Sequence, residues 1–204
     1  MSKKLVIIGA SGHGKVIADI AKKNGYTTIV FLDDDSSKEE CAGYKVVGTT
    51  KDLLLYKYYD FIVGIGNAII RKRIQTELTA NDFHVITLIH PNAVVADDVR
   101  IGEGTVIAAG AVINPCVTIG NGCIINTGAS VDHDNVIEDF AHISVGSHLA
   151  GTVAVGEGTM IGAGAVVINN VSICAGCMVG AGAVVVKNIE NGGTYAGVPA
   201  RWIK

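Results

Sequence analysis

Three neighbouring residues, Asp132, His133 and Asp134, have the clearest potential for chemistry in this sequence, because small and aliphatic side chains surround them. An imidazole beside carboxylates has its protonated form favoured and its tautomer fixed, which is how a general base working near pH 7 is built. The alternative interpretation is a solvated histidine on a polar surface. The clustering of the two acids around His133 favours the catalytic interpretation.

A six-residue repeat contains this cluster. From Ile89 to Glu190 the chain forms 17 consecutive hexads without an insertion, and each hexad begins with Ile, Val or Leu. An aliphatic first position and a mostly small fifth position are typical of a parallel β-helix whose coil is a triangle of three hexads. Such coils wind left-handed, an exception to the right-handed crossover rule. The sequence predicts a left-handed parallel β-helix over 89–190 and a C-terminal cap over 191–204.

The repeat itself shows which residues are unusual. Its second position is mostly Gly or Ala, yet four successive hexads place Asn126, Asp132, Glu138 and Ser144 there. His133 occupies the third position, which should project outward. Because these departures are consecutive, we expect one coil of the β-helix to carry a polar surface around His133.

Two further histidines, His142 and His148, occupy the sixth position of successive hexads and should lie on neighbouring faces of the β-helix. They could be ligands, polar residues at corners, or contacts to a neighbouring subunit. Flat faces of apolar and small residues also favour packing of three copies about a threefold axis. We therefore expect a homotrimer with sites in the clefts between subunits.

The first 88 residues are predicted to form a small α/β domain of the Rossmann-like βαβ type. The apolar patterns indicate strands at 5–8, 29–32, 60–65 and near 84–88, and helices at 15–24 and 68–80. The sequence therefore predicts a two-domain chain, with this α/β domain over 1–88 and the β-helix after it.

Glycines and acids follow the predicted strands of this domain. The turn GASGHG, residues 9–14, offers N–H groups at a helix N-terminus, which suits an anion. Asp33 ends the second strand, where an acid meets a ribose or a base, and Gly66 ends another parallel strand on the same side. The domain has room for one of the two mononucleotide-binding halves of a dinucleotide-binding fold, so a single nucleotide is favoured over a dinucleotide. A tight turn beside a solvated acidic loop is the alternative.

Composition, charge and the length of apolar runs argue against nucleic-acid-binding, secreted and membrane-spanning proteins. A net charge of -3 and 5% aromatic residues give no support for a nucleic-acid surface. The N-terminal apolar run LVII is too short for a signal peptide, and no segment approaches the roughly 20 apolar residues that span a bilayer. We expect a cytoplasmic protein without a membrane span.

Together these motifs resemble the hexapeptide-repeat sugar acetyltransferases of the sialic acid O-acetyltransferase type. The resemblance is closest to bacterial UDP-4-amino-sugar N-acetyltransferases of bacillosamine-type pathways. It covers nearly the whole chain and rests on GASGHG, FLDD (31–34), DFIVGIGN with IRK (60–72), LIHPNA (88–93), NT.ASVDHD (126–134), HISVGSH.AG (142–151) and AGVPAR (196–201).

This resemblance implies transfer of an acetyl group from acetyl-CoA to the amine of a UDP-linked 4-amino-4,6-dideoxy sugar, without a metal. His133 would be the general base, and Asp134 the neighbour that raises its basicity. Acetyl-CoA would contact His142, Ala163 and Ala181. The uridine nucleotide would be held by Ser11, Gly12, His13, Asp33, Asp34 and Gly66.

The chemistry also needs an N–H donor for the tetrahedral oxyanion, and the turn amide of Gly151 is our candidate. Three alternatives stay open. One is O-acetylation of a sugar such as sialic acid. Another is a zinc lyase of the carbonic anhydrase kind, for which His133, His142 and His148 supply the number of ligands. The third is a non-catalytic assembly or nucleotide-sensing protein.

Overall fold

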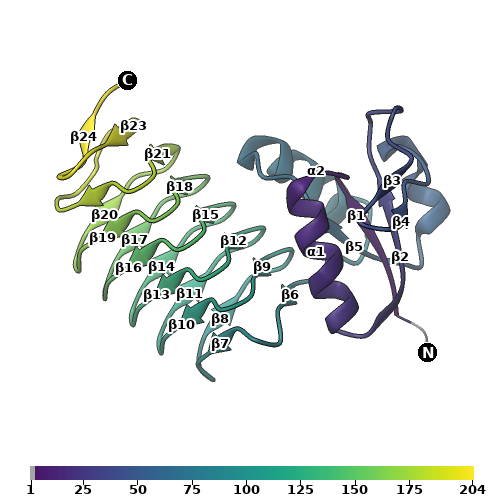
Figure 1. Cartoon of the computed structure of the whole chain (residues 1–204), viewed down its shortest axis with the longest axis horizontal. Helices are drawn as coiled ribbons and strands as arrows, with labels where there is room; N and C mark the ends of the chain where they lie inside the picture. The colour runs from purple at the N-terminus through teal and green to yellow at the C-terminus, as the bar shows by residue number, and fades with distance from the viewer. Residues whose placement is uncertain (1–2) are drawn as a thin grey trace. The chain divides into compact units, whose positions relative to one another are not determined.

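A computed structural model describes residues 3–204, which divide into a first unit ending at Pro91 and a second unit spanning Asn92–Lys204 (Figure 1). The first unit is α/β and the second is a parallel β-solenoid. The fold class predicted from the sequence, an α/β domain followed by a left-handed parallel β-helix, is therefore confirmed. Among the described residues, no helix has the length and apolar character that a bilayer span requires.

A parallel sheet of order β2-β1-β5 forms the centre of the first unit. Its strands are β1 (Lys3–Ile8), β2 (Tyr26–Leu32) and β5 (Asp60–Val63). Continuous apolar runs such as LVII suit strands that are buried on both faces, and all four of these residues are at most 1% exposed. Because the strands are parallel, the glycine turn after β1, the acids after β2 and the glycines after β5 lie at one edge of the sheet.

Two helices flank these strands, α1 (Gly12–Lys23) and α2 (Ala68–Ala80). Ile74 and Leu78 of α2 pack in one core cluster with Val6, Ile8 and Val63. Helix α2 has the predicted bounds. Helix α1 begins three residues before the predicted position 15, inside the glycine turn, although glycine disfavours helix interiors.

The rest of the first unit consists of short elements. These are β3 (Glu40–Cys41), β4 (Tyr44–Lys45), the 3-10 helix η1 (Thr50–Tyr56) and β6 (Leu88–Ile89). The strand predicted near 84–88 is not formed as expected. A single residue, Val85, forms a parallel bridge with Phe61, because the chain follows β5 at that one position before it leaves the sheet.

The second unit winds as a solenoid whose strands stack into three parallel faces (Figure 1). The first face contains β7 (Val94–Val95), β10 (Val112–Ile113), β13 (Ser130–Val131), β16 (His148–Leu149), β19 (Val166–Val167) and β22 (Val184–Val185). The second contains β8 (Arg100–Ile101), β11 (Thr118–Ile119), β14 (Val136–Ile137), β17 (Ala154–Val155) and β20 (Ser172–Ile173). The third contains β9 (Val106–Ile107), β12 (Ile124–Ile125), β15 (His142–Ile143), β18 (Met160–Ile161) and β21 (Cys177–Val179).

Almost every solenoid strand joins the sixth residue of one hexad to the first residue of the next. The first residue points inward, as at Ile125, Val131 and Ile143, each of which is 0% exposed. Successive coils pair residues that are 18 apart, for example Ser130 with His148. The aliphatic first positions therefore form the core, and equivalent corners of successive coils lie above one another.

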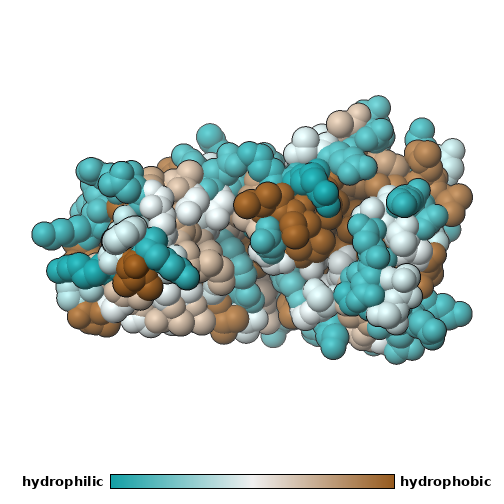
Figure 2. All heavy atoms as spheres, turned by 90° about the horizontal axis from the view of Figure 1, so that it is seen from above, coloured by the Kyte–Doolittle hydropathy of each residue, from teal (hydrophilic) through white to brown (hydrophobic). Residues whose placement is uncertain are grey.

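The cap breaks the hexad period but extends the third face. Strand β23 (Gly193–Ala196) pairs in parallel with β21, and β24 (Arg201–Trp202) folds back against β23. Trp202 and Ile203 are exposed. In Figure 2, brown hydrophobic atoms lie among teal polar ones at this end of the solenoid.

Candidate active site

His133 lies at a solenoid corner and is paired with the next residue. Its Nδ1 is 2.7 Å from Oδ2 of Asp134, and its side chain is 56% exposed. Asp134 has a φ of +59° at the fourth hexad position, as do Cys116 and Thr152, with φ of +63° and +61°, at the same corner of the adjacent coils. A non-glycine residue in this conformation is costly and needs support from its surroundings. The predicted pairing of His133 with Asp134 is thus present in the structure.

Two carboxylates act on the imidazole. The hydrogen bond to Asp134, followed by the charge of Asp132, raises the pKa of His133 above its ordinary value. When Nδ1–H donates to Asp134, Nε2 is the nitrogen left to accept a proton. The arrangement therefore fixes the tautomer that a general base needs.

Asp132 supports the backbone of the turn as well. Its Oδ1 accepts the N–H of His133 at 2.8 Å and the Nδ2–H of Asn114 at 2.7 Å. These two hydrogen bonds, from Asn114 first, lower the pKa of Asp132 below its ordinary value. Asn114 comes from the preceding coil and was not among the predicted site residues.

Gly151 lies directly against the imidazole. It occupies the same corner as His133 one coil later, and a Cβ built on it would stand 2.6 Å from both Cε1 and Nε2 of His133. The backbone N–H of Thr152 also donates to the carbonyl of His133 at 2.9 Å. The structure thus brings Gly151, our oxyanion candidate, together with the proposed base.

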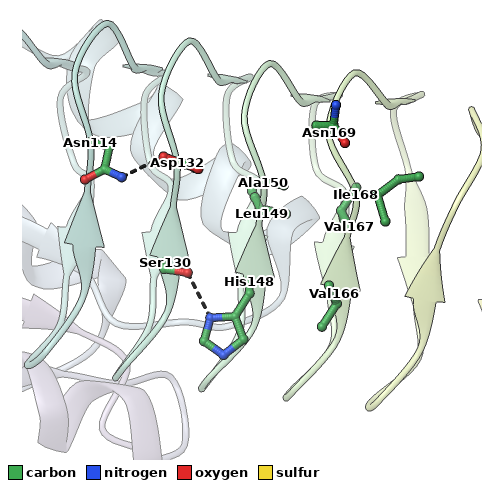
Figure 3. A pocket seen from close by; sticks show the side chains of 10 residues that line it. All are labelled: Asn114, Ser130, Asp132, His148, Leu149, Ala150, Val166, Val167, Ile168 and Asn169. Atoms are coloured by element: carbon green, nitrogen blue, oxygen red, sulfur yellow. Dashed lines mark hydrogen bonds between the residues drawn. The ribbon is translucent and has the colours of Figure 1, made fainter.

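A hollow of about 470 Å³ opens on the first solenoid face beside this turn (Figure 3). In Figure 3, Asn114 and Asp132 hydrogen-bond at one side of it, and Ser130 hydrogen-bonds to His148 lower on the same face. Val166, Leu149 and Ile168 are among its apolar lining residues. It therefore joins an apolar surface to the polar turn that carries His133.

The other residues predicted to bind acetyl-CoA lie elsewhere on the solenoid. His142 belongs to the third face, in β15, and its Nε2 is 3.1 Å from Nδ2 of Asn126. Ala163 and Ala181 are exposed and stack in successive coils at the corner that follows this face, where Gly182 N–H donates to the carbonyl of Ala163. Within one chain, the structure does not bring this group together with His133.

Different faces also separate His142 from His148, as the sequence predicted. His142 lies in β15 of the third face and His148 in β16 of the first face. His133 lies at the corner that follows the first face. Among residues 3–204, no group of three or more His, Cys, Asp or Glu side chains is arranged to hold a metal ion.

The residues predicted to bind the nucleotide gather at the start of α1. Ser11 is the N-cap residue but its side chain makes no capping hydrogen bond, Gly12 faces open space, and His13 is half-buried in the first turn. Unpaired N–H groups at a helix start attract anions. This end of α1 can therefore receive a phosphate.

Asp33 is tied to that turn. Its Oδ2 accepts the N–H of Ala10 at 2.7 Å and the Nζ–H of Lys38 at 2.9 Å. Burial acts to raise the pKa of Asp33, but the hydrogen bonds from Lys38, Asp35 and Ala10 outweigh it, so the pKa is lowered. Asp34 instead accepts two hydrogen bonds from Thr50. Lys38 was not among the predicted site residues.

Gly66 lies in the loop after β5, and Arg71 holds that loop. The Nη1 of this buried arginine is 2.9 Å from the carbonyl of Ile65 and 2.7 Å from that of Gly66. Close packing also fixes the edge of the sheet, since a Cβ at Gly14 would lie 2.2 Å from the carbonyl oxygen of Gly9. Gly14 is thus required for packing, whereas Gly12 leaves space for a ligand.

Comparison with known proteins identifies both parts of the chain. The PglD N-terminal domain family matches residues 4–78, and the bacterial transferase hexapeptide (six repeats) family matches residues 86–115. UDP-N-acetylbacillosamine N-acetyltransferase from Bacillus subtilis (strain 168) is 41% identical over 112 residues, which are 52% of each protein. The chain therefore spans about half the length of the curated relatives it matches.

Solved structures match over the full chain. The acetyltransferase domain of PglB from Neisseria gonorrhoeae FA1090, in complex with acetyl coenzyme A, is 41% identical, with a TM-score of 0.96 and coverage of 100% of both chains. PerB from Caulobacter crescentus, in complex with CoA and GDP-perosamine, is 38% identical, with a TM-score of 0.94 and coverage of 98% of this chain and 97% of that chain. These matches confirm the resemblance indicated by the motifs, and the chain belongs to the hexapeptide-repeat acetyltransferases that carry a PglD N-terminal domain.

Proposed function

We propose that this protein transfers the acetyl group of acetyl-CoA to the amine of a UDP-linked 4-amino-4,6-dideoxy sugar, with His133 as the general base. The observation that carries the proposal is the 2.7 Å contact between His133 Nδ1 and Asp134 Oδ2, with the ring against Gly151. The names of the relatives, an N-acetyltransferase for a UDP-sugar and PerB with bound GDP-perosamine, support an amine on a nucleotide-linked sugar as the acceptor.

The proposed reaction uses each group of the corner. An amine is mostly protonated near pH 7, so His133 Nε2 accepts a proton as the nitrogen attacks the thioester carbonyl. The Gly151 N–H donates to the oxyanion that develops on that carbon. Collapse of the tetrahedral intermediate breaks the carbon–sulfur bond, and the CoA thiolate leaves and takes the proton from His133 Nε2. The other proton of the ammonium form goes to solvent before the attack.

We propose that acetyl-CoA binds between subunits of a homotrimer. Within one chain, His133 lies at one corner of the solenoid, whereas His142, Ala163 and Ala181 belong to the third face and its corner. Two neighbouring copies can bring these two groups together across a cleft. Exposed apolar residues on the first face, including Val94 at 63%, support burial against another copy.

The nucleotide is assigned to the first unit. Ser11, Gly12 and His13 would receive its phosphates at the start of α1, and Asp33, Asp34 and Gly66 would border the nucleoside. Uridine is the proposed base because the relative from Bacillus subtilis acts on a UDP-sugar. The five cysteines are free thiols in the described chain, which suits a reducing cytoplasm.

A panel of acceptors tests the function. Acetyl-CoA is mixed with UDP-, GDP- and CMP-linked amino sugars and with their hydroxyl analogues, and release of the CoA thiol is followed. We expect turnover with a UDP-linked amine. Reaction of hydroxyl acceptors alone would contradict N-acetylation, and a preference for GDP would contradict the assignment of uridine.

His133→Ala tests the base. The variant should lose about 100-fold or more in turnover, the contribution typical of a general base. Its oligomeric state and melting temperature should stay unchanged because the side chain is exposed. Wild-type turnover would refute the role of His133, and stoichiometric zinc in the purified protein would favour the lyase alternative.

A further inference from the structure

Asn135 is an exception to the hexad pattern and lies beside the catalytic turn. It is the single asparagine at the fifth position of the 17 hexads, where other residues are small or apolar. Its side chain is 0% exposed, and an amide buried in such a core must find hydrogen-bond partners. The location of these partners indicates what Asn135 does.

One set of partners joins two coils. Asn135 Nδ2 donates to the carbonyl of Ala150 at 2.9 Å, and Asn135 Oδ1 accepts the N–H of Val153 at 3.0 Å. Thr105 and Thr159 occupy the same hexad position and make equivalent hydrogen bonds, to the carbonyl 15 residues later and from the N–H 18 residues later. A threonine hydroxyl is therefore sufficient to join the coils.

The remaining partners lie in the catalytic turn itself, where the carbonyl of His133 is 3.4 Å from Asn135 Nδ2. Asn135 Nδ2 also donates to the carbonyl of Asp132 at 2.5 Å, three residues earlier. Ser147 makes the corresponding hydrogen bond to the carbonyl of Ser144 at 2.8 Å. The two threonines make the bonds between coils, Ser147 makes the bond within the turn, and Asn135 makes both kinds.

These bonds fix the two backbone segments that surround the imidazole. The turn from Asp132 to Asp134 bears the ring, and the segment from Ala150 to Val153 contains Gly151, against which the ring lies. One buried amide thus sets the position of the His133 turn relative to the Gly151 amide.

We propose that Asn135 is a positioning residue for acetyl transfer, which holds His133 and Asp134 in register with Gly151. This inference rests on the proposed role of His133 as the base. It differs from a role in stability alone, which the threonines at equivalent positions already fulfil.

Two variants separate the roles. Asn135→Thr should keep the bonds between coils, as Thr105 and Thr159 do, but lose the bonds to the carbonyls of Asp132 and His133. We expect an unchanged melting temperature and trimer, unchanged KM values, and a kcat reduced about 10- to 100-fold, because small misplacements of catalytic groups are costly. Asn135→Ser should keep the bond within the turn, as Ser147 does, and retain most of kcat with a lower melting temperature.

Thr105→Ala is the matched control. It removes the same bonds between coils at a site away from His133, so it should lower the melting temperature without changing kcat or its pH profile. Wild-type kcat and pH profile in Asn135→Thr would overturn the inference. The inference would also be overturned if kcat fell in both Asn135 variants in proportion to their loss of stability.

Parallel measurement of His133→Ala distinguishes failure of the positioning role of Asn135 from failure of the proposed base. An inactive His133→Ala enzyme beside a fully active Asn135→Thr enzyme would refute the positioning role and leave the proposed function standing. A fully active His133→Ala enzyme would refute the base assignment and, with it, the role of Asn135.

Discussion

Gly151→Ala tests the geometry of the proposed site with the addition of one methyl group. A Cβ at this position would lie 2.6 Å from Cε1 and Nε2 of His133, whereas ordinary van der Waals contact begins at 3.4 Å. The ring must therefore move by at least the difference, 3.4 − 2.6 = 0.8 Å. The backbone at residue 151 has no positive φ, so alanine adds no conformational strain there.

The displacement predicts a large kinetic effect and a small effect on stability. A misplacement of about 1 Å can lower turnover about 100-fold, which corresponds to about 2.7 kcal/mol of transition-state stabilisation. Because the imidazole is 56% exposed, it can move without disturbing the core. We expect kcat to fall about 100-fold while the melting temperature stays close to that of the wild type.

The assay follows thiol release from acetyl-CoA with the best acceptor of the panel, beside a melting curve for each variant. Gly192→Ala is the matched control, since its Cβ would meet nothing closer than 3.7 Å and its backbone has no positive φ. Alanine also preserves the N–H of residue 151, so a loss cannot be attributed to a missing oxyanion donor. Wild-type kcat in folded Gly151→Ala would refute the view that the ring acts from its observed position.

Two further predictions concern charge. In Asp134→Asn the pKa of His133 should fall toward its ordinary value, because its largest raising cause is removed. A general base works when deprotonated, so the acid limb of the pH profile of kcat/KM should move to lower pH. The plateau of the profile should also be lower. An acid limb that does not move would argue against the His133–Asp134 pair as the titrating group. Asp33→Asn should destabilise the protein at neutral pH, because the lowered pKa of Asp33 stabilises the fold above the unfolded carboxyl pKa of about 3.9. In chemical denaturation, the difference from wild type should shrink below about pH 4 and vanish as pH falls through the lowered pKa; a difference that persists in acid would show that lost charge is not the cause.

The solenoid could be predicted in detail because its signal is local and repeated. An aliphatic residue every six positions defines which side chains enter the core, and each coil needs contacts with its neighbours alone. The same pattern placed His133 outward and separated the faces of His142 and His148. The first unit was less predictable at its ends. Helix α1 begins within a glycine turn because Gly14 packs against Gly9, a contact between separate elements that propensity does not encode.

The sequence by itself determined the fold class, the pairing of His133 with Asp134 and the family resemblance, since each depends on residues that are adjacent or periodic. The tertiary structure alone decided which residues meet across coils. Asn114 and Gly151 contact the His133 turn from 18 positions away, and Asn135 joins that turn to Ala150 and Val153, which lie 15 and 18 positions later; these partners follow from the stacking of coils. A repeat predicts which corner a residue occupies, but hydrogen-bond distance depends on how adjacent coils stack.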